Sequence, residues 1–473
     1  MRLRKILATP ALALLVATGA CDEGLTGINR NPNSPEEVPA ANLLVNAITD
    51  AVGASYGTHG VWAGLYLTNI WSQQIAEVKY NDEDRYIPRP SQVDGIWDQM
   101  YTGPLADLKL IKEIAEEEGD DNLFAVAEIM SQYLFHYLTD IYGDIPYSEA
   151  LAGAENTHPK YDSQQDVYNG ILANLAAAVE RIDPGKSTAS FRAGDELYHG
   201  DMEKWRKFAN SLRMRVAMRL AQVNPEKART EFVAAYNAGG FASNADNASL
   251  VWGVELLSQN PRYDYWYNQD RYDFVMSHAM ISRLQAYDDP RLPIYADTAK
   301  GGVYRGLPNG KLPGDFNLNV PDYSPVGAFF LKPDAPSDLM TYAEVLFLQA
   351  EAAERGWIPG SAADLYQQAI TASMKQYGIS DGAITAYLAQ PSVAYAGLNS
   401  IWEQKWIALF MNGPEAWAEV RRTGVPDLVP AAGDEIPSRL PYPTGEQLYN
   451  QENWASAGGK DVTLWTKMWW MAN

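Results

Sequence analysis

Several long segments of the chain repeat apolar residues at the three- and four-residue spacing of an amphipathic helix. The apolar positions are Leu123, Val126, Met130, Leu134, Tyr137 and Ile141, then Trp205, Phe208, Leu212, Val216 and Leu220, then Tyr342, Leu346, Ala350 and Ala353, then Ala362, Tyr366, Ala369, Ser373 and Tyr377, and finally Trp402, Trp406 and Leu409. The same period holds over 97–115, where Gly103-Pro104 is expected to divide it into two helices. The pattern predicts an all-α fold with little β structure.

Two of these segments predict packed helix pairs. Residues 339–378 have the small and large apolar spacing of a tetratricopeptide pair, with a turn at 356–360. A second pair is expected over 122–181, joined through 142–147. Stacked pairs suit a chain of 473 residues, because each pair contacts only its neighbours and no single large core is needed.

The N-terminus has the layout of an exported lipoprotein. A basic start, a short apolar run from Ile6 to Ala17 and small residues before Cys21 predict a signal peptide over 1–20. Cys21 is the only cysteine of the chain and stands where the signal peptide would be cut, so we expect it to be acylated. A polar tether over 21–38 would follow, and no later segment is apolar and long enough to cross a membrane.

Charge restricts the set of ligands. The formal net charge is −22, and such a surface repels nucleic acid and anionic lipid. The 28 tyrosines and 14 tryptophans are more than a core of this size needs, which leaves aromatic side chains for surface recognition.

Motifs for catalysis are hard to find. No HExxH or GxSxG sequence occurs, and no pair of histidines has metal-ligand spacing on a helix. Residues 306–312 resemble a phosphate loop only faintly, because the glycine spacing is one residue short and Leu312 replaces the required Ser or Thr. Carboxylate pairs are too numerous for a glycosidase pair to be selected or excluded. Asp246 and Asn247 could contact a calcium ion, but no spaced loop motif supports one, and we expect no cofactor.

The positive signals are two clusters of aromatic residues beside polar ones, in the irregular segments of the chain. The candidate ligand-binding residues are Trp71, Gln73, Tyr80, Asp82, Arg85 and Tyr86 in the first cluster, and Tyr263, Tyr265, Trp266, Tyr267 and Tyr272 in the second. Flat rings stack on the C–H face of a sugar, and amide, carboxylate and guanidinium groups bind its hydroxyl rim. A peptide would suit the same surface. The alternative is that these rings pack loops onto the helices.

Short motifs along the whole chain resemble the SusD/RagB family of outer-membrane nutrient-binding lipoproteins, especially its SusD-like branch. They are Cys21 followed by acidic residues, Ile28-Asn-Arg-Asn-Pro-Asn33, Tyr137-Leu-Thr-Asp-Ile-Tyr-Gly-Asp-Ile-Pro-Tyr147, Phe208-Ala-Asn-Ser-Leu-Arg-Met-Arg-Val-Ala-Met-Arg219, Met340-Thr-Tyr-Ala-Glu-Val-Leu-Phe347, Ala350-Glu-Ala352, Gln404-Lys-Trp-Ile-Ala-Leu-Phe410 and Glu415-Ala-Trp-Ala-Glu-Val-Arg-Arg-Thr-Gly424.

This resemblance implies four tetratricopeptide-like helix pairs within one domain over 39–473, with ligand-face insertions near 66–100 and 250–337. It also implies a lipid-anchored protein on the bacterial surface, and a TonB-dependent, SusC-like outer-membrane barrel as partner. The ligands of the family are usually oligosaccharides and sometimes peptides. Because binding residues vary among members, the resemblance transfers no site.

The sequence therefore favours a non-catalytic surface receptor that captures an oligosaccharide or peptide and passes it to the transporter. Two alternatives remain at this point. One is a surface-anchored glycoside hydrolase on a helical scaffold, and the other is a tetratricopeptide adaptor that binds a protein through its groove.

Overall fold

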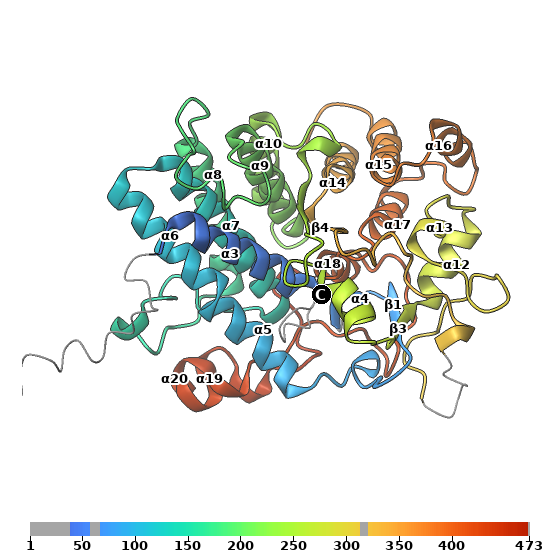
Figure 1. Cartoon of the computed structure of the whole chain (residues 1–473), viewed down its shortest axis with the longest axis horizontal. Helices are drawn as coiled ribbons and strands as arrows, with labels where there is room; N and C mark the ends of the chain where they lie inside the picture. The colour runs from blue at the N-terminus through green and yellow to red at the C-terminus, as the bar shows by residue number, and fades with distance from the viewer. Residues whose placement is uncertain (1–37, 57–66, 313–319, 472–473) are drawn as a thin grey trace, which may run out of the picture.

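The computed structural model describes residues 38–56, 67–312 and 320–471 (Figure 1). The expected signal peptide over 1–20, the acylation site Cys21 and the tether up to residue 37 lie outside the described residues. No helix of the described ranges is long and apolar enough to cross a membrane.

Helices make up most of the described chain. The longer ones are α3 (Ala40–Tyr56), α5 (Pro90–Thr102), α6 (Pro104–Glu118), α7 (Asp121–Tyr142), α8 (Gln164–Arg181), α9 (Met202–Arg219), α10 (Pro225–Ala238), α12 (His278–Ala286), α14 (Tyr342–Glu354), α15 (Ala362–Gln376), α16 (Asp381–Leu388), α17 (Leu398–Ala408) and α18 (Gly413–Thr423). Shorter ones are α4 (Asn69–Trp71), η2 (Glu83–Arg85), η3 (Gly153–Glu155), η4 (Asn244–Asp246), α11 (Pro261–Tyr263), η5 (Asp264–Asn268), α13 (Leu292–Tyr295), η6 (Val320–Asp322), α19 (Thr444–Tyr449), α20 (Gln451–Ser456) and η7 (Gly459–Asp461).

The predicted helix pairs are present. Helices α14 and α15 form the pair expected over 339–378, and α7 and α8 form the pair expected over 122–181. The predicted break at Gly103-Pro104 separates α5 from α6, and α9 pairs with α10. Capping side chains stabilise the N-termini of several helices. The side chain of Asp120 accepts from Leu123 N at 3.0 Å at the start of α7, and that of Ser361 accepts from Asp364 N at 3.1 Å at the start of α15.

Two small antiparallel sheets lie among the helices. Strand β1 (Ile75–Glu77) pairs with β3 (Phe274–Met276), and β2 (Ala248–Val251) pairs with β4 (Pro336–Met340). Both sheets join segments that are far apart in the chain. The stretch over 250–337 also contains the helices α12 and α13, for which the sequence analysis made no prediction.

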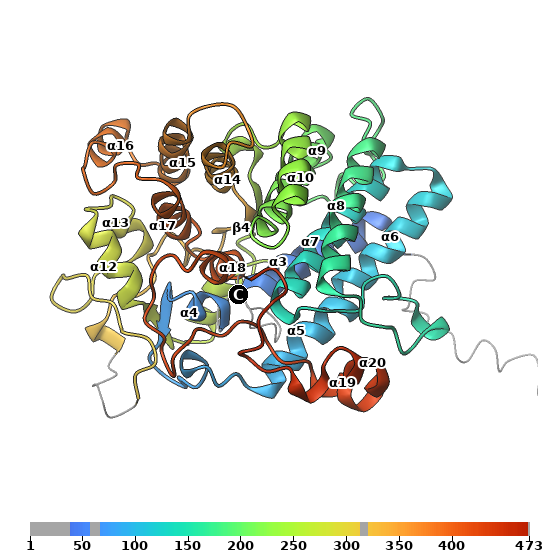
Figure 2. The ribbon, with the colours of Figure 1, turned by 180° about the vertical axis from the view of Figure 1, so that it is seen from behind.

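A network of buried charges lies where the helix groups meet. Helices α7 to α10 stand on one side and α14 to α17 on the other, with α18 between them in both views (Figures 1 and 2). The buried cations are Arg215 and Arg219 of α9, Lys405 of α17, and Arg421 and Arg422 of α18, and the buried carboxylates are Asp140 of α7, Glu344 and Glu351 of α14, and Glu415 and Glu419 of α18. Five positive groups thus face five negative ones.

Arg219 shows how this network connects the helices. Its guanidinium lies 3.1 Å from the carboxylate of Asp140, 2.6 Å from Glu415 and 2.9 Å from Glu419. Burial raises the pKa of Glu415, but the nearby Arg219 and Arg215 outweigh burial and lower it to about 2. The carboxylate therefore stays ionised in the folded protein. Removing one partner would leave an uncompensated buried charge, which typically costs about 3–5 kcal/mol.

His136 gives the protein an acid sensitivity that can be measured. Burial lowers the pKa of His136 from 6.5 to about 4, with Asp140 at 3.4 Å partly opposing this shift. Between pH 6.5 and 4 the unfolded chain binds a proton at this position and the native chain does not. The neutral, buried His136 makes its full contribution to the free energy of unfolding above pH 6.5. About 3 kcal/mol of that free energy is lost as the pH falls to 4.

We predict that His136→Gln removes this part of the pH dependence. Urea unfolding at pH 7 and pH 4.5 should show a smaller difference for the variant than for the wild type. The exposed His158→Gln is the matched control and should keep the wild-type difference. An unchanged pH dependence in His136→Gln would show that this imidazole is not kept neutral by burial.

Candidate ligand-binding face

The two predicted aromatic clusters meet at the β1–β3 sheet. Strand β1 follows the start of the first cluster, and β3 comes directly after the second. The strands pair from Ile75 opposite Met276 to Glu77 opposite Phe274. Residues separated in sequence by all of α5 to α10 therefore lie side by side in this part of the molecule (Figure 1).

Trp71 does not belong to the ligand-binding surface, contrary to the prediction. Its side chain is fully buried, and its indole N–H donates to the carbonyl of Glu83 at 2.9 Å. The ring packs edge-on against Trp417, with centroids 5.2 Å apart, and against Tyr86. Trp71 therefore fixes the turn after β1 to helix α18.

Gln73 and Tyr86 are also structural. The Gln73 amide donates to the carbonyl of Val429 at 2.6 Å, and the Tyr86 hydroxyl accepts from Ala431 N at 2.8 Å. Both side chains are buried, and burial raises the pKa of Tyr86 to about 12. The two residues hold the 429–431 loop, so their prediction as ligand contacts is wrong.

Tyr80, Asp82 and Arg85 remain at the surface. Tyr80 is 66% exposed, and the guanidinium of Arg271 lies 5.4 Å from the centre of its ring. The side chains of the exposed Asp82 and the partly exposed Arg85 form an ion pair at 3.7 Å. The exposed ring of Tyr80, with the Asp82 carboxylate and the Arg85 guanidinium beside it, can take part in binding a polar ligand.

The second cluster divides in the same way. Tyr265 and Trp266 are buried, where Trp266 packs on Phe274 and the Tyr265 hydroxyl donates to Asp273 at 2.5 Å. They pack the segment against β3, so their prediction as ligand contacts is also wrong. Their neighbour Tyr267 is 50% exposed.

Tyr263, Tyr267 and Tyr272 continue the surface that begins at Tyr80. The rings of Tyr263 and Tyr267 lie 5.1 Å apart, and Tyr272 is 38% exposed. Partial desolvation, the Asp270 carboxylate and the nearby Tyr267 together raise the pKa of Tyr272. We call Tyr80, Tyr263, Tyr267 and Tyr272 the tyrosine face.

Arg271 connects the two halves of this face. Its guanidinium lies over the rings of both Tyr80 and Tyr265 and forms an ion pair with Asp273 at 2.5 Å. Arg271 directly precedes Tyr272 in the second segment and was not among the predicted contacts. Its position between two tyrosines depends on the β1–β3 pairing, which no local pattern reveals.

Three carboxyl groups with raised pKa values lie beneath the tyrosine face. Burial raises the pKa of Asp84 to about 7 and also raises those of Glu77 and Glu83. Raised values are common at catalytic sites. Here, however, the side chains are buried, and Asp84 accepts from Asn309 at 2.6 Å and from Gly310 N at 2.9 Å. Asp84 thus attaches the 307–311 loop to the first cluster, while Glu77 accepts from Asp84 N at 3.1 Å and Glu83 pairs with Arg89 at 2.8 Å. All three carboxyl groups are buried and out of reach of a surface ligand.

An exposed apolar loop borders the second cluster. Leu256 and Leu257 are 67% and 99% exposed. The loop is held in place, since Gly253 N donates to Ser258 O at 2.8 Å and Ser258 N to Glu255 O at 2.8 Å. Aliphatic side chains presented in this way are typical of protein contacts rather than of sugar contacts. In the sequence, the two adjacent leucines follow other apolar residues, so nothing there marks them as exposed.

The structure adds no support for a metal ion. Among the residues that it describes, no group of three or more His, Cys, Asp or Glu side chains is placed to hold one. Asp246 instead accepts from Lys207 at 2.9 Å and from Ala242 N at 2.7 Å. The side chain of Asn247 accepts from Tyr342 N at 2.7 Å.

The fold and this face together define a class: a stack of helix pairs whose intervening segments present aromatic and polar side chains at the surface. A family model described as "Starch-binding associating with outer membrane" matches residues 32–443. The chain belongs to this SusD-like family, which confirms the resemblance seen in its motifs. Comparison with curated proteins finds no match.

Solved structures agree over nearly the whole chain. A structure described as a chitin-binding protein is 30% identical, with a TM-score of 0.81, and the match covers 92% of this chain and 100% of that one. A chitin-binding SusD homolog from Flavobacterium johnsoniae is 28% identical, with a TM-score of 0.80 and coverages of 91% and 99%. A SusD homolog from Bacteroides uniformis is 27% identical, with a TM-score of 0.79 and coverages of 91% and 99%. The predicted helical SusD-like fold is thus confirmed.

Neighbouring residues of the second cluster should respond differently to truncation. Trp266→Ala removes a buried ring and is expected to lower the unfolding free energy by about 3–5 kcal/mol. Tyr267→Ala removes a half-exposed ring and should lower it by less than about 1 kcal/mol. Urea unfolding of both variants measures the two effects, and equal losses would contradict this division into core and face.

Proposed function

We propose that the protein is a non-catalytic cell-surface receptor that binds oligosaccharides on the tyrosine face. The observation that carries the proposal is the gathering of four exposed or half-buried tyrosine rings, from two distant segments, at the β1–β3 sheet. Their rings offer faces for the C–H side of a sugar. Asp82, Arg85 and Asp270 lie close by to bind hydroxyl groups. Membership of a family described as starch-binding and outer-membrane-associated supports the same ligand class.

The names of two similar structures suggest a first ligand to test. Both are described as chitin-binding. Neutral N-acetylglucosamine oligomers combine a ring for stacking with amide and hydroxyl groups for hydrogen bonding, which suits a face of tyrosines and polar side chains. We therefore choose N-acetylchitohexaose as the probe, with malto-, cello- and xylo-oligosaccharides as alternatives and short peptides as the competing class.

Loss of exposed rings should weaken binding without unfolding the protein. Tyr80→Ala and Tyr267→Ala should each remove about 1 kcal/mol of stacking, which raises Kd about fivefold, and the double variant should raise it about 30-fold. Tyr449→Ala is the control, because this tyrosine of α19 is 76% exposed but lies outside the face. Equilibrium dialysis with each oligosaccharide measures Kd.

The same samples test the hydrolase alternative. Binding without the release of reducing ends during prolonged incubation is the expected result for a receptor. Release of shorter oligosaccharides would contradict the non-catalytic part of the proposal. Unchanged affinity for every bound oligosaccharide in the Tyr80, Tyr267 double variant would contradict the tyrosine face as its site.

We further propose that the protein is lipid-anchored through Cys21 at the outer-membrane surface and delivers its ligand to a SusC-like, TonB-dependent barrel. The lipobox-like sequence and the family membership support this proposal. Handover of a ligand requires that the receptor meet the transporter near the tyrosine face. The ordered apolar loop with Leu256 and Leu257 borders that face and offers the surface for such a contact.

A charged substitution in this loop should break the contact with the transporter. Leu256→Asp combined with Leu257→Asp is expected to reduce co-purification of a TonB-dependent barrel, identified by mass spectrometry, at least tenfold from detergent-solubilised native membranes. Leu448→Asp on α19 is the matched control, since Leu448 is 72% exposed and distant in sequence from the loop. If the wild type purifies without a barrel, delivery to such a transporter is contradicted. If the loop variant keeps the barrel, only the docking surface is wrong.

A further inference from the structure

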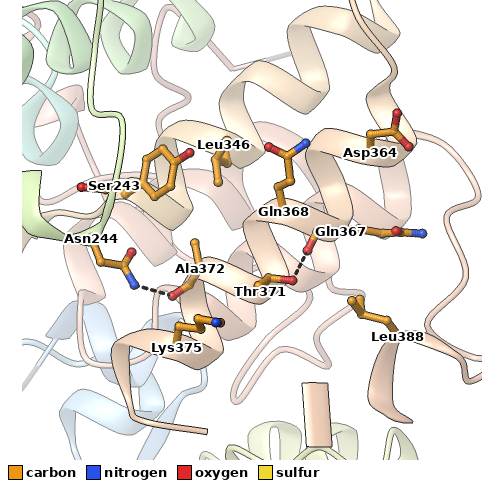
Figure 3. Close-up of a pocket in the computed structure, with 11 residues that line it drawn as sticks. Ser243, Asn244, Leu346, Asp364, Gln367, Gln368, Thr371, Ala372, Lys375 and Leu388 are labelled. Atoms are coloured by element: carbon orange, nitrogen blue, oxygen red, sulfur yellow. Dashed lines mark hydrogen bonds between the residues drawn. The ribbon is translucent and has the colours of Figure 1, made fainter. Parts of the chain in front are cut away.

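A cavity lies away from the tyrosine face, between α14, α15, α16 and η4 (Figure 3). Its volume is about 620 Å³, which is within the range of small-ligand sites. The lining residues are Ser243, Asn244, Tyr342, Leu346, Asp364, Gln367, Gln368, Thr371, Ala372, Lys375 and Leu388. Helices α14 to α16 lie along the top of the molecule, whereas β1 and β3 lie lower down (Figure 1).

The lining combines apolar side chains with side chains that form hydrogen bonds. The large apolar residues of the lining are Leu346, Leu388 and Tyr342. Gln367 and Gln368 are exposed on α15, and their amides can both donate and accept hydrogen bonds. This combination of one ring, aliphatic surface and neutral amides matches a pyranose, which has an apolar face and a hydroxyl rim.

Charge also favours a neutral ligand. The cavity has one carboxylate, Asp364, and one ammonium group, Lys375, at opposite ends of α15. Lys375 forms an ion pair with Asp381 at 2.7 Å, so its charge is already compensated. Because the whole chain carries a net charge of −22, an anionic ligand would meet repulsion without a compensating cation in the cavity.

The wall of the cavity includes an incompletely satisfied amide. Asn244 donates its Nδ2 hydrogen to the carbonyl of Ala372 at 2.9 Å (Figure 3). Its Oδ1 is buried and accepts no hydrogen bond within the described residues. A buried acceptor left without a donor costs about 1–3 kcal/mol. A hydroxyl-rich ligand in the cavity could relieve this cost after a small rotation of the side chain.

We propose that this cavity is a second oligosaccharide subsite, which binds a short stretch of a neutral glycan independently of the tyrosine face. The inference rests on the proposed function for the ligand class but on different residues for its site. With two separate subsites, the protein would hold two glycan chains, or two parts of one long glycan, at once. When one glycan occupies both subsites, binding at the first raises the effective concentration at the second and so raises the apparent affinity.

The test counts binding sites. Equilibrium dialysis of fluorescently labelled N-acetylchitohexaose and of the three other oligosaccharide series measures the number of molecules bound and each Kd. We compare the wild type, the pocket variant Gln367→Ala with Gln368→Ala, the face variant Tyr80→Ala with Tyr267→Ala, and both together. Gln165→Ala, an exposed glutamine of α8 outside the cavity, is the matched control.

The expected result is two sites per chain in the wild type. The pocket variant should weaken one site at least fivefold and leave the other unchanged, and the face variant should do the reverse. A Thr371→Trp variant, which fills the cavity with a bulky ring, should abolish the same site that the glutamine variant weakens. Thermal unfolding of each variant checks that its fold is retained.

The outcomes separate the two proposals. One site per chain that only the face variant weakens would overturn the second subsite and leave the proposed function intact. One site that only the pocket variants weaken would support the subsite and overturn the tyrosine face. Binding of a short peptide, but of no oligosaccharide, to the cavity would overturn the glycan assignment, and no binding of any oligosaccharide would overturn both proposals.

Discussion

The buried ion network is the constraint on which the arrangement of the helices depends. It places Arg219 of α9 within 3.2 Å of carboxylates from α7 and α18, and it places Arg422 of α18 at 2.7 Å from Glu351 of α14. Because buried charges are tolerated only in matched and hydrogen-bonded sets, the helices that carry them can approach in few ways. The segments between these helices, including both small sheets, take their positions from this frame.

Much of the helical frame follows from local patterns in the sequence. The apolar period and the turn at 356–360 predict α14 and α15, and Gly103-Pro104 marks the boundary between α5 and α6. The sequence does not reveal the network so directly. Arg421 and Arg422 of α18 donate to a carbonyl and a carboxylate inside the protein, and their partners Asp140 and Glu351 come from helices elsewhere in the chain.

The candidate site was predictable as a region and not residue by residue. Both aromatic segments contribute to one surface, yet Trp71 and Trp266, the largest rings, are core residues. Large rings gain the most from burial, so abundance of aromatics cannot tell a packed loop from a binding loop. In the second segment the four-residue spacing of Tyr263 and Tyr267 on a helical turn is the signal that distinguishes the exposed rings.

The central claim is that the tyrosine face holds sugar rings. A crystal structure of the protein soaked with N-acetylchitohexaose, or with whichever oligosaccharide binds most tightly, tests it most directly. We expect a pyranose stacked on at least one of Tyr80, Tyr263, Tyr267 and Tyr272, with its hydroxyl groups bonded to neighbouring charged side chains. A bound glycan that contacts none of these four tyrosines would contradict it.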